Sequence, residues 1–522
     1  MTTFSPSIER SFRKVLVANR GEIAVRVVRA LREAGIRSAV VYSDADRAGL
    51  PILLADEAHH IGPAPSAESY LRGEAIVDLA VRIGADAIHP GYGFLSENAE
   101  FARRCEEQDV VFIGPPSSAI AAMGSKIESR RLMIDAGVPV VPGGRDPLPD
   151  AEAALAFAAE VGYPVMLKAS AGGGGKGMRM VSSPDQLETA FRDARSEAEA
   201  AFGDDAVYLE KFVDEPRHVE VQVLGDAHGK VVHLCERECS LQRRNQKVVE
   251  EAPSPVLDGS LRRRMGEAAI RAAAAVGYTN AGTVEFLLDK NHDFFFLEMN
   301  TRLQVEHPVT EMVTGIDLVQ AQLHVARGGA LGPEFDDVSP RGHAIEVRLY
   351  AEDPARGFAP SPGRIDVLRW PEGPGIRNDA GVYEGAEIPI YYDPMIAKLI
   401  AWGSDRDQAI RRLQRALAEL RLEGIASSVP LFQRILSDED FRAGRMDIKM
   451  LERKMEDGSW AVEPATADAD LPLVAAALAH FARQQQVTSI AGGSAEDAAH
   501  TGSRRQWRLA ARREATGGAP WS

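Results

Sequence analysis

The feature that most constrains this chain is a predicted β-hairpin over residues 283–300. Two β-prone runs, Thr283–Leu288 and Phe294–Asn300, flank a segment rich in turn residues, Asp289–Asp293. If Asp289 pairs with Phe294 across the turn, the rest of the register is fixed. It then pairs Leu287 with Phe296, Glu285 with Glu298 and Thr283 with Asn300.

The alternation of side chains along these strands separates an apolar face from a polar one. The apolar face would hold Val284, Phe286, Leu288, Phe295, Leu297 and Met299. The other face would hold Glu285, Glu298 and Asn300. Two carboxylates facing each other, roughly 5 Å apart at Cβ, repel unless a cation lies between them. Their oxygens suit a hard divalent cation, so we expect a metal site; a surface hairpin with solvated glutamates is the alternative.

The length and charge of the chain limit the classes of protein it can be. A length of 522 residues predicts roughly three or four domains. The net charge of -16 argues against a nucleic-acid or anionic-membrane partner. We see no apolar run of membrane-spanning length, and residues 1–14 are too short and too charged for a signal peptide, so we expect a cytoplasmic protein. Three cysteines exclude a disulfide framework.

The order of predicted elements indicates an α/β protein with several domains. Up to about residue 125, four short apolar strands (14–19, 38–42, 85–89 and 110–114) alternate with helical stretches, as in a parallel, doubly wound sheet. Helices are expected at 151–161, 184–200 and 259–276, with β-rich segments between 164 and 236. After about residue 343 the pattern becomes more antiparallel, and it ends in an amphipathic helix at 405–422. The predicted domains are 1–125, 126–342, 343–454 and a tail, 455–522.

A glycine-rich loop is the second strong feature. Gly172–Gly175 stand between Lys168 and Lys176, with strand-like residues on both sides. Four glycines let backbone amides wrap an anion, and the lysines add positive charge, so the loop is predicted to cradle phosphates and to close as a lid. The spacing does not match a Walker A loop. A flexible linker is the alternative.

A polar run directly after the hairpin predicts an oxyanion site. Asn300, Arg302, Gln304 and Glu306 would point one way if the chain stayed extended. A guanidinium, an amide and a carboxylate beside a metal-bound phosphate could hold a small planar oxyanion and remove its proton.

The chain resembles a known family. Four segments are similar to the biotin carboxylase component of biotin-dependent carboxylases, an ATP-grasp family: His89 to Asn98, Lys168 to Met178, Glu236 to Pro253 and Glu298 to Glu311. The similarity runs from about residue 13 to 453. Asn245 and the phrase at 169–178 look most similar to the α subunits of propionyl-CoA and related acyl-CoA carboxylases. Ser125 and Ser427-Ser-Val429 depart from the family's Gly-Asp-Lys and Thr-Asn-Ile.

The resemblance implies a fold and a set of roles. It implies an ATP-grasp core with a lid at about 140–215, preceded by the doubly wound domain and followed by a mixed, largely antiparallel domain. The implied phosphate-binding residues are Lys126, Lys168, Gly172, Gly173, Gly174 and Gly175. Those around adenine and ribose are Met178, Glu210, Lys211, Val213, His218, Gln242, Leu287 and Ile448. Two Mg²⁺ ions, with Mn²⁺ as a substitute, would bind Glu285, Glu298 and Asn300. Bicarbonate would bind Lys247, Arg302, Gln304 and the Val305 backbone, with Glu306 as its base. Biotin would bind Tyr92, Gly93 and Arg348.

The implied reaction is ATP-dependent carboxylation of biotin through carboxyphosphate. We see no Ala/Val-Met-Lys-Met biotinylation motif, so the expected partners are a separate biotin carboxyl carrier protein and a carboxyltransferase subunit, in a homodimer or a larger hetero-oligomer. The predicted helix at 471–485, with Trp507 and the basic segment 504–513, is expected to dock one of them. The alternatives are another ATP-grasp ligase that joins an acid to an amine, and a non-catalytic ATP-binding regulator.

Overall fold

The computed structural model describes residues 10–144, 147–169, 178–203, 205–463, 473–474 and 477–479. The chain divides into two compact units, residues 1–462 and 463–522. Of the predicted tail helix, residues 473–474 and 477–479 are helical, and Leu473, Val474 and Leu478 are exposed. The rest of that helix, the glycine loop and the basic segment lie outside the described residues. Every described helix is too short or too polar to span a bilayer.

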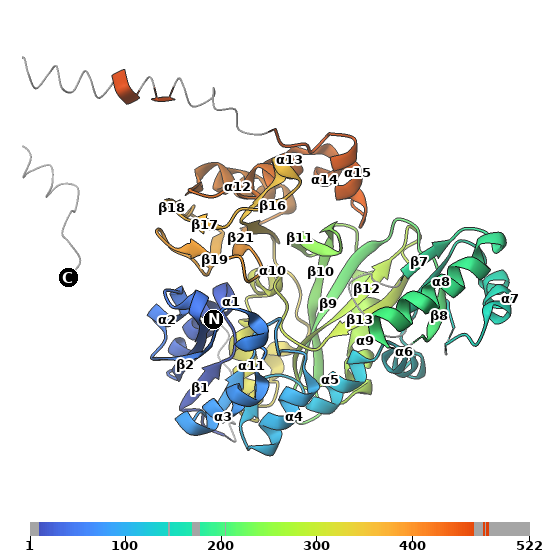
Figure 1. Ribbon diagram of the computed structural model, residues 1–522, viewed down its shortest axis with the longest axis horizontal. Helices are drawn as coiled ribbons and strands as arrows, with labels where there is room; N and C mark the ends of the chain where they lie inside the picture. Colours follow the sequence, from blue (N-terminus) through green and yellow to red (C-terminus); the bar gives the residue numbers. More distant parts are fainter. Residues whose placement is uncertain are drawn as a thin grey trace, which may run out of the picture. The chain divides into compact units, whose positions relative to one another are not determined.

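The first unit begins with a five-stranded parallel sheet in the order β3-β2-β1-β4-β5 (Figure 1). Its strands are β1 (Lys14–Val17), β2 (Arg37–Ser43), β3 (Glu57–Gly62), β4 (Ala87–His89) and β5 (Val111–Phe112). The helices between and after them are α1 (Gly21–Glu33), α2 (Leu50–Leu54), α3 (Gly73–Ile83), α4 (Ala99–Glu107) and α5 (Ser117–Gly124). This confirms the doubly wound sheet. β3 was not predicted, because this strand at the edge of the sheet has polar, half-exposed residues in place of an apolar run.

The strand order places the loop after β4 at a predictable position. β1 and β4 are neighbours in the sheet, although β2 and β3 come between them in sequence. The order in which strands are added to the sheet therefore changes direction at this pair. In open parallel sheets, ligands bind beyond the carboxyl ends of the strands at such a point. Asn19, after β1, donates to the carbonyls of Pro90 at 2.6 Å and Tyr92 at 2.8 Å, after β4. The two loops are therefore joined where a ligand is expected.

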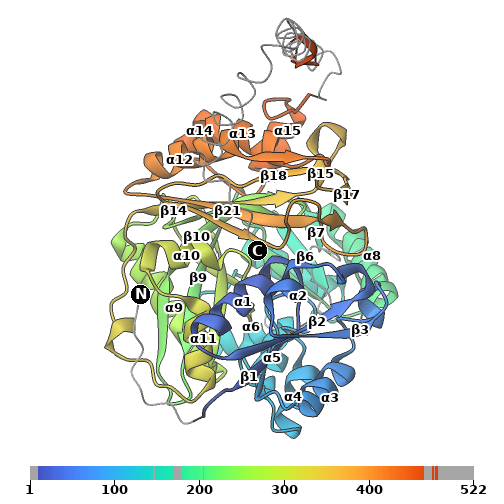
Figure 2. The same ribbon diagram turned by 90° about the vertical axis from the view of Figure 1, so that its left-hand side faces the viewer.

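The largest sheet has eight strands in the order β13-β12-β9-β10-β11-β14-β21-β19. Its strands are β9 (Arg217–Gly225), β10 (Val231–Arg243), β11 (Gln246–Ala252), β12 (Asn280–Leu288), β13 (Phe294–Asn300), β14 (His343–Tyr350), β19 (Ile376–Ala380) and β21 (Met395–Gly403). Because β11 pairs with β14, the sheet crosses the boundary predicted near residue 343. Figure 2 shows α12 (Arg406–Glu419) and α13 (Val429–Ser437) along the β14–β21 end, where α12 packs on both strands.

A smaller antiparallel sheet, β7-β6-β8, lies beside α7 and α8. It consists of β6 (Val165–Ala169), β7 (Met178–Val181) and β8 (Val207–Lys211), with α7 (Ala151–Val161) and α8 (Pro184–Phe202) packed on it. Lys168 pairs with Met178, so the residues on either side of the glycine loop form the two strands of a hairpin, as predicted.

Further helices complete the first unit. They are α6 (Lys126–Asp135), α9 (Gly259–Ala275), α10 (His307–Thr314), α11 (Leu318–Ala326), α14 (Glu439–Arg442) and α15 (Met450–Glu456). The remaining strands are short antiparallel pairs: β15 (Glu352–Asp353) with β16 (Ala359–Pro360), β17 (Gly363–Arg364) with β20 (Glu387–Ile388), and β18 (Val367–Arg369) with β22 (Arg421–Glu423). The predicted ATP-grasp core and mixed C-terminal region are thus both present.

The β12–β13 hairpin confirms half of the predicted register and corrects the other half. Glu285 pairs with Glu298 and Thr283 with Asn300, as predicted. Nearer the turn, Phe286 pairs with Phe296, Leu287 with Phe295 and Leu288 with Phe294. The predicted pairs Leu287–Phe296 and Asp289–Phe294 are therefore wrong. The reason is a bulge at Leu297, the extra residue between Phe296 and Glu298 on β13.

The bulge changes which aromatic side chains enter the core. Phe294 and Phe296 pack with Val284, Phe286, Leu288 and Met299 beneath α9, whereas Phe295 and Leu297 are half-buried. A bulge shifts alternation by one residue, so the side chains before it exchange faces. The polar face beyond it keeps the predicted Glu285, Glu298 and Asn300.

Candidate active site

The two carboxylates of the predicted metal site differ in their surroundings. Glu285 is buried: its Oε1 accepts from Lys247 Nζ at 2.8 Å and Asn300 Nδ2 at 2.8 Å, and its Oε2 lies 2.9 Å from His218 Nε2. Glu298 is exposed. Burial opposes ionisation, but Lys247 and His218 hold the pKa of Glu285 well below its ordinary value. Partial desolvation, followed by repulsion from Glu285, raises the pKa of Glu298.

These residues fit a divalent cation. Two carboxylates and an amide oxygen are the donors that Mg²⁺ prefers, and a cation beside Glu298 would offset its repulsion from Glu285. The ammonium of Lys247 and the imidazole of His218 lie against Glu285. Burial opposes the charge of His218, but Glu285 still raises its pKa above the ordinary value.

Lys247 connects the predicted metal site to the predicted bicarbonate site. Its Nζ contacts four acceptors from different segments: Glu220 on β9, Glu285 on β12, Gln304 at 3.1 Å and Glu306 at 2.6 Å. Burial opposes its charge, yet the surrounding carboxylates raise the pKa of Lys247 well above its ordinary value. Lys247 therefore carries a positive charge shared by three carboxylates, each of which has one further basic partner: His218, Arg237 and Arg348.

The residues after β13 converge as predicted, but the chain does not stay extended. β13 ends at Asn300, and α10 starts at His307 after a turn. Arg302 donates to Asn300 Oδ1 at 2.9 Å and to Glu97 Oε2 at 2.8 Å, and Gln304 donates to Glu285 at 3.1 Å. The turn, and not a continued strand, aims these groups at the site. Glu97, from the loop after β4, was not singled out from the sequence.

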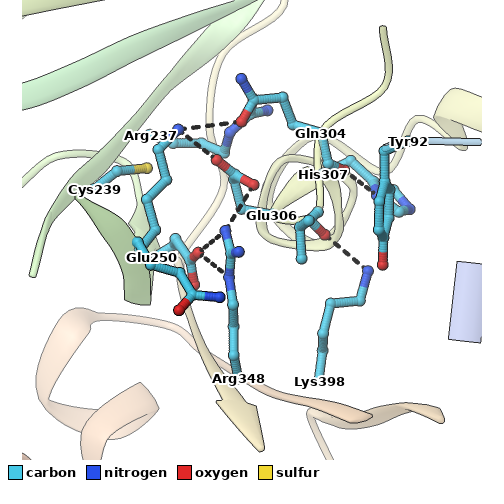
Figure 3. Close-up of polar contacts among 12 residues, drawn as sticks. Tyr92, Arg237, Cys239, Glu250, Gln304, Glu306, His307, Arg348 and Lys398 are labelled. Carbon is cyan, nitrogen blue, oxygen red and sulfur yellow. Dashed lines mark hydrogen bonds and ion pairs between the residues drawn. The ribbon is translucent and has the colours of Figure 1, made fainter. Parts of the chain in front are cut away.

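Glu306 lies between two cations (Figure 3). Its Oε1 accepts from Lys247 at 2.6 Å, and its Oε2 accepts from Arg348 at 3.0 Å. Arg348 also donates through Nε to Glu250 at 2.6 Å. Burial opposes ionisation of Glu306, but Lys247 and Arg348 hold its pKa far below the ordinary value. The predicted base and the predicted biotin-binding arginine are thus in direct contact.

Tyr92, predicted to line the biotin pocket, reaches the same cluster through a lysine. Lys398 Nζ lies 5.8 Å from the centroid of the Tyr92 ring, donates to the Val305 carbonyl at 2.7 Å and lies 3.1 Å from Glu22 (Figure 3 shows Lys398 and Tyr92). The Tyr92 hydroxyl donates to Glu22. Gly93, with φ +69°, takes the left-handed conformation that lets the loop turn at this point. Lys398 thereby links the predicted biotin pocket to the predicted bicarbonate site.

The predicted phosphate-binding end is described in part. Lys168 Nζ lies 2.6 Å from Glu210 Oε2, and Arg130 holds the other oxygen of Glu210 at 2.7 Å. Burial and then repulsion from Lys168 lower the pKa of Lys126, which places these two lysines near each other. Gly172, Gly173, Gly174 and Gly175 lie outside the described residues. Met178, at the start of β7, is exposed.

The predicted adenine-side residues have mixed placements. Gln242 donates to His218 Nδ1 at 3.0 Å, and Leu287 follows Glu285 by two residues on β12, half-buried on the same side. Ile448 N donates to Pro216 O at 3.1 Å, which brings it towards the segment containing Val213. Lys211 donates instead to the carbonyls of Gly162 and Tyr163. Neither is a predicted site residue, and the Lys211 ammonium contacts none of the predicted site residues within the described part of the chain.

Sequence reasoning missed the buried charges that surround these groups. Arg237, fully buried on β10, contacts Glu220, Gln222, Thr283 and Thr310. Glu220, Glu250 and Lys398 lie on strands of the same sheet. A signal was available in β9 and β14, where polar or charged residues alternate with apolar ones, but such a pattern is also typical of a solvated face. Arg237, Glu250 and Lys398 lack it, because β10 and β11 have adjacent charged residues and β21 has one.

Comparison with known proteins gives a consistent result along the chain. Residues 11–120 match the model "Biotin carboxylase, N-terminal domain", residues 125–333 match "Carbamoyl-phosphate synthase L chain, ATP binding domain", and residues 346–453 match "Biotin carboxylase C-terminal domain". These matches cover all the strands and helices that build the site.

Individual proteins are similar to this chain over most of its length. Biotin carboxylase 1 of Bacillus subtilis is 52% identical over 441 residues, covering 84% of this chain and 98% of the relative. The propionyl-CoA carboxylase alpha chain of Ruegeria pomeroyi is 48% identical over 501 residues, covering 92% and 74%. The biotin carboxylase domain dimer of Hydrogenobacter thermophilus 2-oxoglutarate carboxylase, solved with MgADP, ADP and bicarbonate, has a TM-score of 0.81 and 47% identity, covering 87% of this chain and all of that one.

Proposed function

The chain belongs to the biotin carboxylase family and is an ATP-dependent biotin carboxylase, and we propose that the cluster around Lys247, Glu306 and Arg348 carries out the reaction. The observation that carries this assignment of roles is the position of Glu306. Its two carboxylate oxygens contact one cation at the metal end of the site and one at the biotin end. A base at this position can act on a substrate bound between the nucleotide and biotin.

Bicarbonate would bind by contacting the Lys247 ammonium, which already contacts Glu306. The contact with Lys247 stabilises the Glu306 carboxylate, which makes it a weak base. A bicarbonate anion bound by Lys247, Arg302, Gln304 and the Val305 backbone would share the Lys247 ammonium and add negative charge beside Glu306. Both changes raise the pKa of Glu306, so substrate binding itself prepares the base.

The deprotonated bicarbonate would then attack the γ-phosphorus of ATP, which releases ADP and forms carboxyphosphate. Lys126 and Lys168 would neutralise the transferring phosphoryl group, and the glycine loop would exclude water from the carboxyphosphate product. Glu285, Glu298 and Asn300 would hold Mg²⁺, which supplies charge neutralisation between the phosphates when bound. Met178, Glu210, His218, Gln242, Leu287 and Ile448 are proposed to surround the nucleoside.

Biotin would be carboxylated at the Arg348 end of the cluster. Carboxyphosphate breaks down to CO2 and phosphate, and the phosphate takes the proton from the ureido nitrogen of biotin. Arg348 would stabilise the resulting enolate, which attacks CO2, while Tyr92 and Gly93 line the pocket. Arg348 is held by Glu250 on one side, so its guanidinium is already oriented before biotin arrives.

We further propose that the biotin is carried on a separate carrier protein and that a carboxyltransferase subunit completes the reaction on an acyl-CoA. The match to a propionyl-CoA carboxylase alpha chain, which extends over 92% of this chain, supports the acyl-CoA class. A homodimer or larger hetero-oligomer and a cytoplasmic location complete the proposal. The biotin carboxylase dimer among the similar structures supports self-association.

Substrate-dependent ATP cleavage tests the proposal. The purified chain should release phosphate from ATP only when bicarbonate and Mg²⁺ are present, and free biotin should increase the rate. An acid-amine ligase would share the carboxylates of β12 and β13 but would not need bicarbonate or biotin. Phosphate release that is independent of both would therefore contradict the proposal.

A further inference from the structure

One face of β14 carries a buried acidic residue, Glu346, that the proposed reaction does not use. All eight residues of β14 are buried. Ile345, Val347 and Leu349 face an apolar core that includes α12 and α13. The opposite face carries Glu346 and Arg348, and it is covered by α10, whose Val309 and Val313 pack on Ala252, Ala344 and Ile400.

Two carboxylates lie directly opposite each other on this covered face. Glu250 on β11 pairs with Glu346 on β14, and neither has any exposed surface. Side chains at such positions start roughly 5 Å apart at Cβ, and like charges there repel. The repulsion is not screened by water, because α10 covers this face of the sheet.

The nearby cations already contact other groups. Arg348 donates to Glu250 Oε1 and also to Glu306. Lys398 donates to the Val305 carbonyl and forms an ion pair with Glu22. Within the described part of the chain, three oxygens of the pair have no hydrogen-bond partner: Glu250 Oε2 and both oxygens of Glu346. One arginine cannot compensate two buried carboxylates and Glu306 together.

We propose that Glu250 and Glu346 share one proton and that this acid pair positions Arg348. With one proton the pair has a single negative charge, which balances the guanidinium and provides a donor for an unpartnered oxygen. Arg348 can then contact Glu306 and remain in place for biotin. Loss of the shared proton would create a second carboxylate that competes for Arg348 and draws it away from Glu306.

The electrostatic surroundings agree with this geometry. Burial raises the pKa of Glu250 to about 7 and the pKa of Glu346 well above its ordinary value. The charged groups that face the pair are Arg348 on β14, Lys398 on β21, Lys247 on β11 and Glu306 before α10. On α10, burial holds the pKa of His307 well below its ordinary value, so it adds no positive charge.

The proposal predicts a specific effect of pH on stability. A carboxyl whose pKa is raised in the folded state binds more protons folded than unfolded, so stability falls as pH rises from about 4.5 through the folded pKa. Glu346→Gln removes this proton-linked loss while keeping a neutral side chain of the same size. Its melting temperature should therefore fall less than that of the wild type between about pH 6 and pH 9.

Glu251→Gln is a matched control on the same strand. Glu251 is equally buried but lies on the other face, where Arg406 and His343 overcome the effect of burial and lower its pKa to about 2. Its stabilising contribution is present above the unfolded pKa and is lost as pH falls. The cost of Glu251→Gln should therefore be greatest at neutral pH and should not flatten the alkaline fall in stability.

Two further measurements on the full chain separate a positioning role from a structural one. The infrared difference spectrum of wild type minus Glu346→Gln at neutral pH should contain the carbonyl band of a protonated carboxyl, because other buried acids, such as Glu22 with a pKa that burial raises to about 7, contribute equally to both spectra. The alkaline limb of the pH profile of kcat should also move to higher pH in Glu346→Gln. At about pH 9 this variant should keep several-fold more of its neutral-pH kcat than the wild type keeps. If the Glu346→Gln variant does not fold, the Glu346→Met variant is measured in its place, because any neutral side chain here should remove the proton-linked loss of stability.

The proposal is wrong if the difference spectrum lacks this band, or if the alkaline profiles of stability and kcat do not change. The role of Arg348 rests on the proposed function, but the infrared and melting measurements do not need the enzyme to turn over. Failure of the acid pair can thus be distinguished from failure of the proposed reaction.

Discussion

Replacing Glu306 with Gln removes the proposed base while keeping the shape of its side chain. Glu306 is almost fully buried, and it accepts one charged hydrogen bond from Lys247 and one from Arg348. Lys247 keeps Glu220 and Glu285 as partners, and Arg348 keeps Glu250, so the variant leaves neither cation alone. The chain should therefore fold and bind nucleotide.

The size of the effect follows from the role assigned to Glu306. Loss of a positioned general base costs about 10²–10⁴-fold in rate, which corresponds to about 3–5 kcal/mol of transition-state stabilisation. We expect this loss in bicarbonate-dependent phosphate release from ATP, with nucleotide affinity measured by calorimetry changed little. The stability cost should shrink as the pH falls, because the folded-state pKa of Glu306 is lowered and its carboxylate stabilises the fold only above the unfolded pKa.

Glu236→Gln provides the control for this prediction. Glu236 is also buried on the large sheet, and it accepts hydrogen bonds from Arg262 Nε at 2.7 Å and Arg262 Nη2 at 2.9 Å. It contacts none of the proposed site residues in the described structure. It should lower the melting temperature without lowering kcat. Loss of ATP binding in Glu306→Gln, in parallel with phosphate release, would refute the assignment and make Glu306 a nucleotide-binding or structural residue.

Three other changes test other parts of the site. Glu298→Gln should lower turnover by orders of magnitude at limiting Mg²⁺ in a folded protein, because one anionic ligand is lost; near wild-type activity would contradict the metal assignment. Lys247→Met should destabilise the chain by about 3–5 kcal/mol at neutral pH and by less in acid, because it removes the cation that three buried carboxylates share; a pH-independent cost in melting experiments would contradict this reasoning. Truncation after Val462 keeps Trp460, which is buried in the first unit, and should leave carboxylation of free biotin intact while impairing that of carrier-bound biotin. Equal loss of both activities would assign the tail to the catalytic unit.

The sequence predicted those parts of the structure in which a local pattern decides the outcome. The strands up to residue 125 are short apolar runs and the helices at 151–161, 184–200 and 259–276 are rich in helix-forming residues, and the structure places elements within a few residues of each prediction. The facing of Glu285 and Glu298 was predicted from a turn register that is wrong, and it is correct because the bulge at Leu297 restores the predicted pairing beyond it. The bulge itself was not predicted, because an extra residue in one strand leaves no mark on composition or period.

The missed residues have a different explanation. Glu220, Arg237, Glu250 and Lys398 lie on strands that come together from segments up to about 180 residues apart. The first three depend on a partner from another strand, and Lys398 depends on Glu22 of α1. Charged residues in one strand look the same whether their side of the sheet meets solvent or another layer. Only the covering of the sheet by α10 makes these charges buried and mutually dependent, and a single sequence does not contain that information.

The same dependence explains how the fold holds so many buried charges at one site. The Lys247 ammonium and the His218 imidazole lie against Glu285, where we assign Mg²⁺, and Glu306 lies against Lys247, where we assign bicarbonate. Each of these ligands would therefore take over a contact that a side chain of the protein already makes, and the buried charges of Glu285 and Glu306 are paired within the protein itself. This arrangement also links the two ends of the reaction, because bicarbonate that draws Lys247 from Glu306 leaves Arg348 as the remaining cation on that carboxylate. The guanidinium proposed to receive biotin is then held most firmly when the first substrates are in place.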